Sequence, residues 1–111
     1  MTERKRFSPE ERDRIFEKCL KEYGDTAQMD MLIEEMSELI QAVMKWRRAG
    51  NSQARGMYRT HIIEELADVK IMARQMELLF DCTEELEGWI DYKVERQIGR
   101  LAEKIGGAEN E

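Results

Sequence analysis

The sequence predicts an all-α protein, a bundle of about four helices in which two long antiparallel helices are central. Apolar residues recur every three to four positions over long stretches of the 111-residue chain, which is the period of an α-helix. The chain also has a single proline, so little interrupts such helices. This length fits one domain, residues 1–111, and we expect flexible tails at 1–7 and 106–111.

The first helix is predicted to begin at Pro9 and to run to about Glu22. Ser8 is a good N-cap residue, Pro9 suits the first helical position, and Glu11 can complete a capping box with Ser8. Gly24 then ends the helix, because glycine readily adopts the backbone conformation that follows a helix.

Two long helices are expected next, one from Asp25 or Thr26 to Ala49 and one over roughly 57–80. Between them, residues 50–56 form a polar connection bounded by glycines. Each helix carries an apolar stripe at helical spacing, which we expect to face a core. The stripe residues are Met29, Leu32, Ile33, Met36, Ile40 and Val43 in the first of these helices, and Ile62, Leu66, Val69, Ala73, Met76 and Phe80 in the second.

A last helix is expected from about Glu84 to Ile105, after a short break at 81–83 and before two glycines. A break this short predicts that it lies antiparallel to the preceding helix. Gly88 and Gly99 each weaken it by about 1 kcal/mol relative to alanine, so it should depend on tertiary packing.

Composition and charge argue against several classes of protein. The net charge is −6 and no run of four basic residues occurs, so no nucleic-acid partner is expected. No apolar run resembles a signal peptide or membrane span, which predicts a cytoplasmic protein with no membrane partner. Cys19 and Cys82 lack zinc-site spacing and are expected to be reduced thiols. Because 38% of residues are charged, the core is thin and a homo-oligomer is favoured.

Two acidic motifs repeat at an offset of 30 residues. They are Ile-Glu-Glu-Met-Ser-Glu-Leu at 33–39 and Ile-Glu-Glu-Leu-Ala-Asp-Val at 63–69. Residues three apart share a helix face, so Glu35 lies with Glu38, and Glu65 lies with Asp68. Mostly uncharged residues bracket both pairs along their stripes, whereas solvated acids usually have Lys or Arg beside them.

Four carboxylates that converge between neighbouring helices repel one another unless a cation intervenes or some are protonated. All-oxygen ligation suits hard cations, and Mg²⁺ combines a few carboxylates with substrate phosphates. The spacing therefore indicates either a hard-cation site for phosphoryl or nucleotidyl hydrolysis or solvated surface acids. A di-iron bundle is excluded because it needs two Glu-x-x-His motifs, and the sole histidine, His61, is not in one.

The region from Gln28 to about residue 105 resembles the MazG-like family of all-α nucleoside triphosphate pyrophosphohydrolases. The resemblance rests on Gln28 and on the acidic runs EEMSEL at 34–39 and EELADV at 64–69. The run IDYKVERQI at 90–98 is similar to a family segment of the form Asn-x-Lys-aromatic-x-Arg. Asp91 and Val94 depart from that form at its Asn and aromatic positions.

The resemblance implies hydrolysis of a (deoxy)nucleoside triphosphate to monophosphate and pyrophosphate, as in nucleotide-pool cleaning, by a MazG-like homodimer or homotetramer. The implied cofactor is Mg²⁺, with Mn²⁺ as a substitute. The implied metal ligands are Glu35, Glu38, Glu65 and Asp68. The candidates for activating water are Glu34, Glu38 and Glu64. The candidate substrate contacts are Lys93, Arg96, Gln28 and Asp91, the last of which could instead be a metal ligand. Trp46 is a further candidate, which could stack on a base or pack in a core.

Two alternatives remain open from the sequence. One is a non-catalytic helical homo-oligomer whose acids are solvated or hold a structural cation. The other is an enzyme like phosphoribosyl-ATP pyrophosphatase, whose second acidic motif usually continues into Tyr-His. Here Val69 and Lys70 follow Asp68, so this alternative ranks lower.

Overall fold

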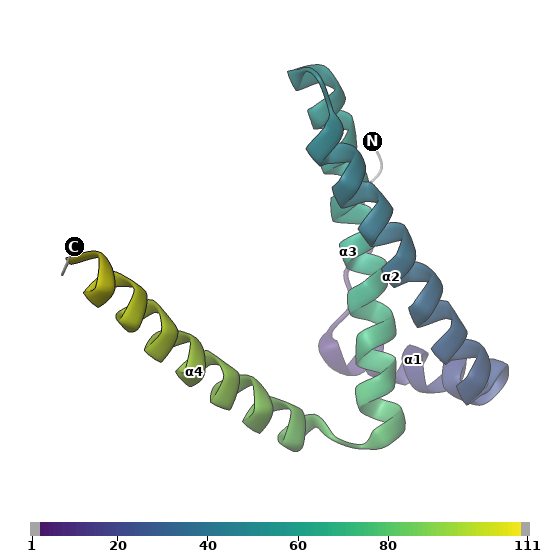
Figure 1. The fold of residues 1–111 in the computed structure, drawn as a ribbon. Helices are drawn as coiled ribbons and strands as arrows, with labels where there is room; N and C mark the ends of the chain where they lie inside the picture. Colours follow the sequence, from purple (N-terminus) through teal and green to yellow (C-terminus); the bar gives the residue numbers. More distant parts are fainter. Residues whose placement is uncertain (1–2, 110–111) are drawn as a thin grey trace. The chain divides into compact units, whose positions relative to one another are not determined.

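The computed structural model describes residues 3–109, with side chains described as far as 107, and these residues contain four α-helices and no strand (Figure 1). The all-α prediction is confirmed; residues 1–2 and 110–111 of the expected tails lie outside the described residues. The helices are α1 (Pro9–Tyr23), α2 (Asp25–Arg48), α3 (Ser52–Phe80) and α4 (Thr83–Glu109). Residues up to Phe80 form one compact unit and the residues from Asp81 onward form another. Each unit is described by itself below.

The start of α1 follows the predicted capping box. The Ser8 hydroxyl accepts a hydrogen bond from the Glu11 N–H at 3.1 Å, and the Ser8 N–H donates to the Glu11 carboxylate at 3.0 Å. At the other end, Gly24 has a φ of 91°, a conformation that L side chains rarely adopt. Glycine at this position therefore lets α1 end and α2 begin one residue later.

The start of α3 was predicted wrongly, because the helix begins at Ser52 rather than near Met57. Asn51 provides the cap: its side-chain oxygen accepts a hydrogen bond from the Ala54 N–H at 2.9 Å. Gly56 lies inside the helix, and a Cβ there would meet nothing within 4 Å. The connection between α2 and α3 is thus shortened to three residues, 49–51.

The end of α4 was also predicted wrongly, because the helix continues through Gly106 and Gly107 to Glu109. Glycine lowers helix stability by about 1 kcal/mol but does not force a helix to stop. Most described side chains of α4 are exposed. The expected packing of α4 against α3 stays a prediction.

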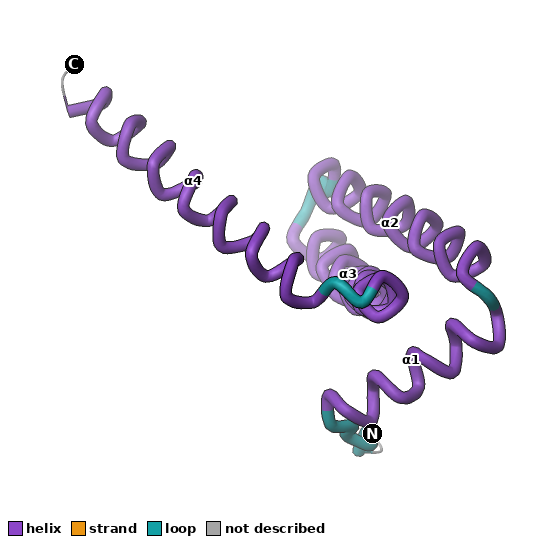
Figure 2. Tube along the Cα trace, turned by 90° about the horizontal axis from the view of Figure 1, so that it is seen from below, coloured by secondary structure: helices purple, strands orange, loops and turns teal. Residues whose placement is uncertain are grey.

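Within the first unit, α2 and α3 lie side by side and α1 contacts both (Figures 1 and 2). Arg74 on α3 is linked to Asp13 on α1 by two hydrogen bonds. Its guanidinium donates to both carboxylate oxygens of Asp13, at 2.9 and 2.8 Å. It also donates to Glu77, one turn along α3, at 3.1 Å. The hydrogen bonds from Arg74 lower the pKa of Asp13, so this link persists into mildly acidic solution.

The face that α2 turns toward the unit's interior differs from the predicted one. Its buried and half-buried residues include Gln28, Leu32, Glu35, Leu39 and Ala42. Apolar spacing cannot choose between two adjacent faces of one helix when both carry apolar residues, and here the acidic stripe faces inward. The residues expected in the core but exposed in the structure are Ile33, Met36, Ile40 and Val43 on α2, and Leu66, Ala73 and Phe80 on α3.

Candidate metal centre

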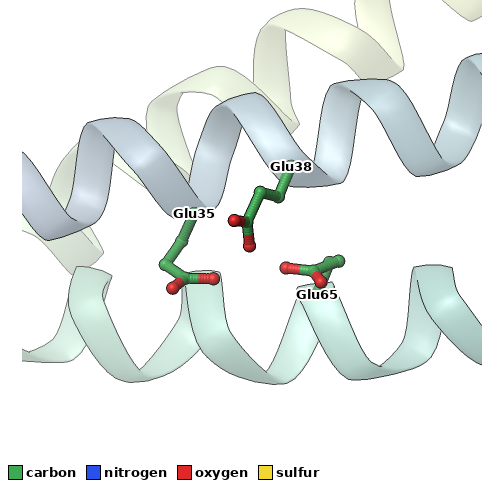
Figure 3. Close-up of side chains that lie close together, drawn as sticks. All are labelled: Glu35, Glu38 and Glu65. Atoms are coloured by element: carbon green, nitrogen blue, oxygen red, sulfur yellow. The ribbon is translucent and has the colours of Figure 1, made fainter.

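Three of the four predicted carboxylates meet between α2 and α3. Glu35 and Glu38 extend from α2, and Glu65 extends toward them from α3 (Figure 3). One carboxylate oxygen from each residue lies within 4.8 Å of those from the other two. The spacing of three residues brings Glu35 and Glu38 to one face of α2, and the short turn at 49–51 brings α3 back alongside.

Two of these carboxylates are poorly solvated. The Oε2 atoms of Glu35 and Glu65 are buried and have no hydrogen-bond partner among the described residues. The pKa of Glu35 is raised to about 7, mainly by burial and then by the negative charges of Asp68, Glu38 and Glu65, in that order of importance. Burial is also the main cause of the raised pKa of Glu65, followed by the charge of Glu38. Ionising both carboxylates without a cation is therefore unfavourable.

The donor set fits a hard divalent cation. It consists only of carboxylate oxygens, the ligands that Mg²⁺ and Mn²⁺ accept, and contains no sulfur or imidazole. Buried oxygens normally have a partner, and a cation bound here would give one to the Oε2 atoms of Glu35 and Glu65. Glu38 is more exposed than these two residues and so borders water. The three side chains can therefore hold a cation on a surface that substrate could reach.

The remaining predicted acids lie outside this cluster. Asp68 on α3 is exposed and is not one of the three converging residues, but its charge raises the pKa of Glu35. It therefore lies near enough to act electrostatically on the cluster. Glu34 and Glu64 are exposed on α2 and α3, and neither contributes an oxygen to the cluster.

The two predicted substrate contacts in the first unit, Gln28 and Trp46, differ in burial. Gln28 is buried, and its side-chain N–H donates to the Gln75 side-chain oxygen at 2.6 Å. Sequence reasoning missed Gln75, since a lone glutamine on a helix gives no signal of its partner. Trp46 is 37% exposed near the end of α2, and the Arg55 guanidinium lies 4.8 Å from its ring centre.

The predicted contacts Asp91, Lys93 and Arg96 all lie on α4. Their side chains are exposed in the described structure. They belong to the second unit, so the geometry of the acidic cluster is built without them.

A groove in the first unit is a separate feature. It has a volume of about 750 Å³, lies between α1 and α3, and has apolar lining from Phe7, Ile15, Phe16 and Ile71. None of the clustered carboxylates lines it. The acidic cluster is therefore identified by its chemistry and not by the depth of a pocket.

No family model, curated protein or solved structure matches the chain. Across the part of the chain that the structure describes, no helix combines the length and the apolar character needed to cross a membrane. The features of the chain that indicate a function are the chemistry of the acidic cluster and the two acidic sequence motifs.

Proposed function

We propose that the protein is a Mg²⁺-dependent pyrophosphohydrolase that converts a (deoxy)nucleoside triphosphate to a nucleoside monophosphate and pyrophosphate in the cytoplasm. The observation that carries the proposal is the meeting of Glu35, Glu38 and Glu65, two of which have buried oxygens without a partner. Such a set favours a hard cation, and Mg²⁺ is the hard cation that proteins most often combine with phosphates. Among the reactions of phosphate compounds, the resemblance of the acidic motifs at 34–39 and 64–69 to the MazG-like family favours hydrolysis of a nucleoside triphosphate.

Each acid has a distinct role in this proposal. Glu35 and Glu65 hold the cation, since their buried oxygens have the greatest need of one. Glu38 is more exposed, so it can contact both the cation and a water molecule. Asp68 completes the ligand set from the exposed side of α3. The bound cation supplies charge neutralisation and orientation of the phosphates.

The residues outside the cluster have supporting roles. Glu34 and Glu64 are the alternatives to Glu38 for orienting water. Lys93 and Arg96 supply the positive charge that substrate phosphates need, and Asp91 lies on the same helix. Because they lie on α4, this part of the proposal requires α4 of one copy or another to approach the cluster.

The proposal includes a homodimer or homotetramer with a MazG-like arrangement. On α2, four large apolar side chains follow helical spacing and are 47–66% exposed: Ile33, Met36, Ile40 and Met44. A contiguous apolar stripe of this kind is costly in water and is usually covered by another protein surface. We propose that a second copy of this chain covers the exposed apolar stripe of α2.

The test is pyrophosphate release from a panel of canonical and modified nucleoside triphosphates in the presence of Mg²⁺. We expect turnover with wild type, and its loss on addition of EDTA. Glu38→Gln should abolish turnover, whereas Glu22→Gln, an exposed acid on α1, should not change it. No turnover with any nucleotide, together with no thermal shift on adding Mg²⁺, would favour the non-catalytic oligomer. Activity restricted to phosphoribosyl-ATP would favour the related pyrophosphatase.

A further inference from the structure

Positive charge is concentrated at one end of the first unit, where α2 turns into α3. Residues 39–63 contain five basic side chains and no Asp or Glu. The other 86 residues carry 13 basic and 24 acidic side chains, a net charge of −11. We call this region the cationic end; its basic residues are Lys45, Arg47, Arg48, Arg55 and Arg59.

The charges of the cationic end are not neutralised locally. All five side chains are exposed, and the ion pairs found among the described residues involve none of them. Arg55 instead lies over the ring of Trp46, a contact that leaves its charge in place. An anion from solution therefore meets no competing carboxylate here.

The helix dipoles explain only part of this arrangement. Lys45, Arg47 and Arg48 lie in the last turn of α2, where the partial negative charge of a helix C-terminus favours cations. Arg55 lies at the end of the first turn of α3, where the partially positive N-terminus disfavours a cation, and Arg59 lies one turn further along, where the dipole gives it no support. Their placement is better explained by a ligand than by the stability of α3.

The cationic end is close to the acidic cluster along both helices. Lys45 is seven residues, or two turns, from Glu38, which is about 10 Å at 1.5 Å per residue and on the same face of α2. Arg59 is six residues from Glu65, or about 9 Å along α3. Both separations slightly exceed the Debye length of about 8 Å at physiological salt, so these charges act on anions near the cluster mainly at lower ionic strength.

We propose that the cationic end is an anion-binding surface for polyphosphate groups, and that it gathers nucleotide beside the acidic cluster. Guanidinium groups donate pairs of hydrogen bonds that match phosphate oxygens, and four of the five basic residues are arginines. A protein with a net charge of −6 otherwise repels a polyphosphate, and a local positive patch reverses this at the point of approach. The anion site stands on its own; its role as a supplier of substrate rests on the proposed function.

The test is calorimetric titration of the full chain with inorganic tripolyphosphate in EDTA at low ionic strength. Without metal, the acidic cluster cannot bind phosphates, so only a cationic surface responds. The test variant is the triple R47Q/R48Q/R59Q. The matched control is R14Q/K18Q/K21Q, which removes the same charge from exposed positions on α1. We expect the test triple to weaken binding by about tenfold or more and the control by less than about twofold.

Each outcome bears on the proposal. Absence of binding by wild type, or equal losses in the two triples, would overturn it, because net charge alone would then explain the data. Much tighter binding of a single-stranded oligonucleotide than of tripolyphosphate would also overturn it in favour of a nucleic-acid surface. Displacement by nucleoside triphosphate supports a substrate site, and displacement by pyrophosphate alone supports a product site. If wild type bound tripolyphosphate but hydrolysed no nucleoside triphosphate, the proposed function would be refuted and the anion site would still be supported.

Discussion

Replacing Glu35 with Gln should stabilise the metal-free protein above neutral pH. In the folded chain the pKa of Glu35 rises from 4.5 to about 7. Below about pH 4.5 the carboxyl is protonated in both states and stability is full. As pH rises toward 7 the unfolded carboxyl ionises first, so the folded state loses stability, and the loss is complete above pH 7.

The size of this effect follows from the pKa. At about 1.4 kcal/mol for each unit of pKa shift, the loss is at most about 3–4 kcal/mol. Water around the exposed Glu38 and Asp68 screens part of the repulsion, so we expect about 1–2 kcal/mol. For a domain of this size that corresponds to a change in Tm of roughly 4–8 °C.

The assay is thermal unfolding in EDTA across the range from about pH 5 to about pH 8. The Tm of wild type should fall across this range, that of Glu35→Gln should fall much less, and Mg²⁺ should recover the loss in wild type only. Glu34→Gln, the neighbouring exposed acid, should keep the wild-type slope. If Glu35→Gln and wild type had equal slopes, the claim that Glu35 is destabilised by burial and repulsion would be wrong.

Three further predictions concern other parts of the first unit. Asp68→Asn should reduce turnover by at least about tenfold while leaving the helical circular dichroism unchanged; an unchanged rate would remove Asp68 from the site. Gln75→Leu should destabilise the protein by about 1–3 kcal/mol in urea unfolding because it leaves the buried Gln28 amide without its partner. The double variant Gln28→Leu/Gln75→Leu should recover most of that loss, and equal losses in single and double variants would contradict this account. Ile40→Lys should lower the molar mass measured by light scattering if a second copy covers the exposed stripe of α2.

The sequence allowed the features that depend on near neighbours to be predicted. The capping box of Ser8 and Glu11 spans three residues, and so does the pairing of Glu35 with Glu38; each depends only on helix geometry. The start of α3 was missed because the Asn51 cap lies in a stretch without apolar periodicity.

Features that join distant segments could not be predicted. Arg74 and Asp13 are 61 residues apart, and Gln28 and Gln75 are 47 apart, so no local pattern connects either pair. The inward face of α2 was misjudged for the same reason. Whether Ile40 or the acidic stripe contacts α3 depends on the side chains of α3 that face α2. The sequence pattern of α2 alone does not contain that information.

The buried amide pair has a consequence for the alignment of the two long helices. The chain reverses direction at 49–51 (Figure 1). For any residue of α2 and the residue of α3 that lies opposite it, the two residue numbers therefore add up to the same total. The level that joins Gln28 to Gln75 also places Glu38 opposite Glu65, and Glu35 opposite Asp68. A slip of one helical turn would shift these levels by about 5.4 Å and separate the carboxylates. The acids repel and cannot align themselves, so the uncharged Gln28–Gln75 hydrogen bond, about two turns from Glu35 and from Asp68, helps to hold their register.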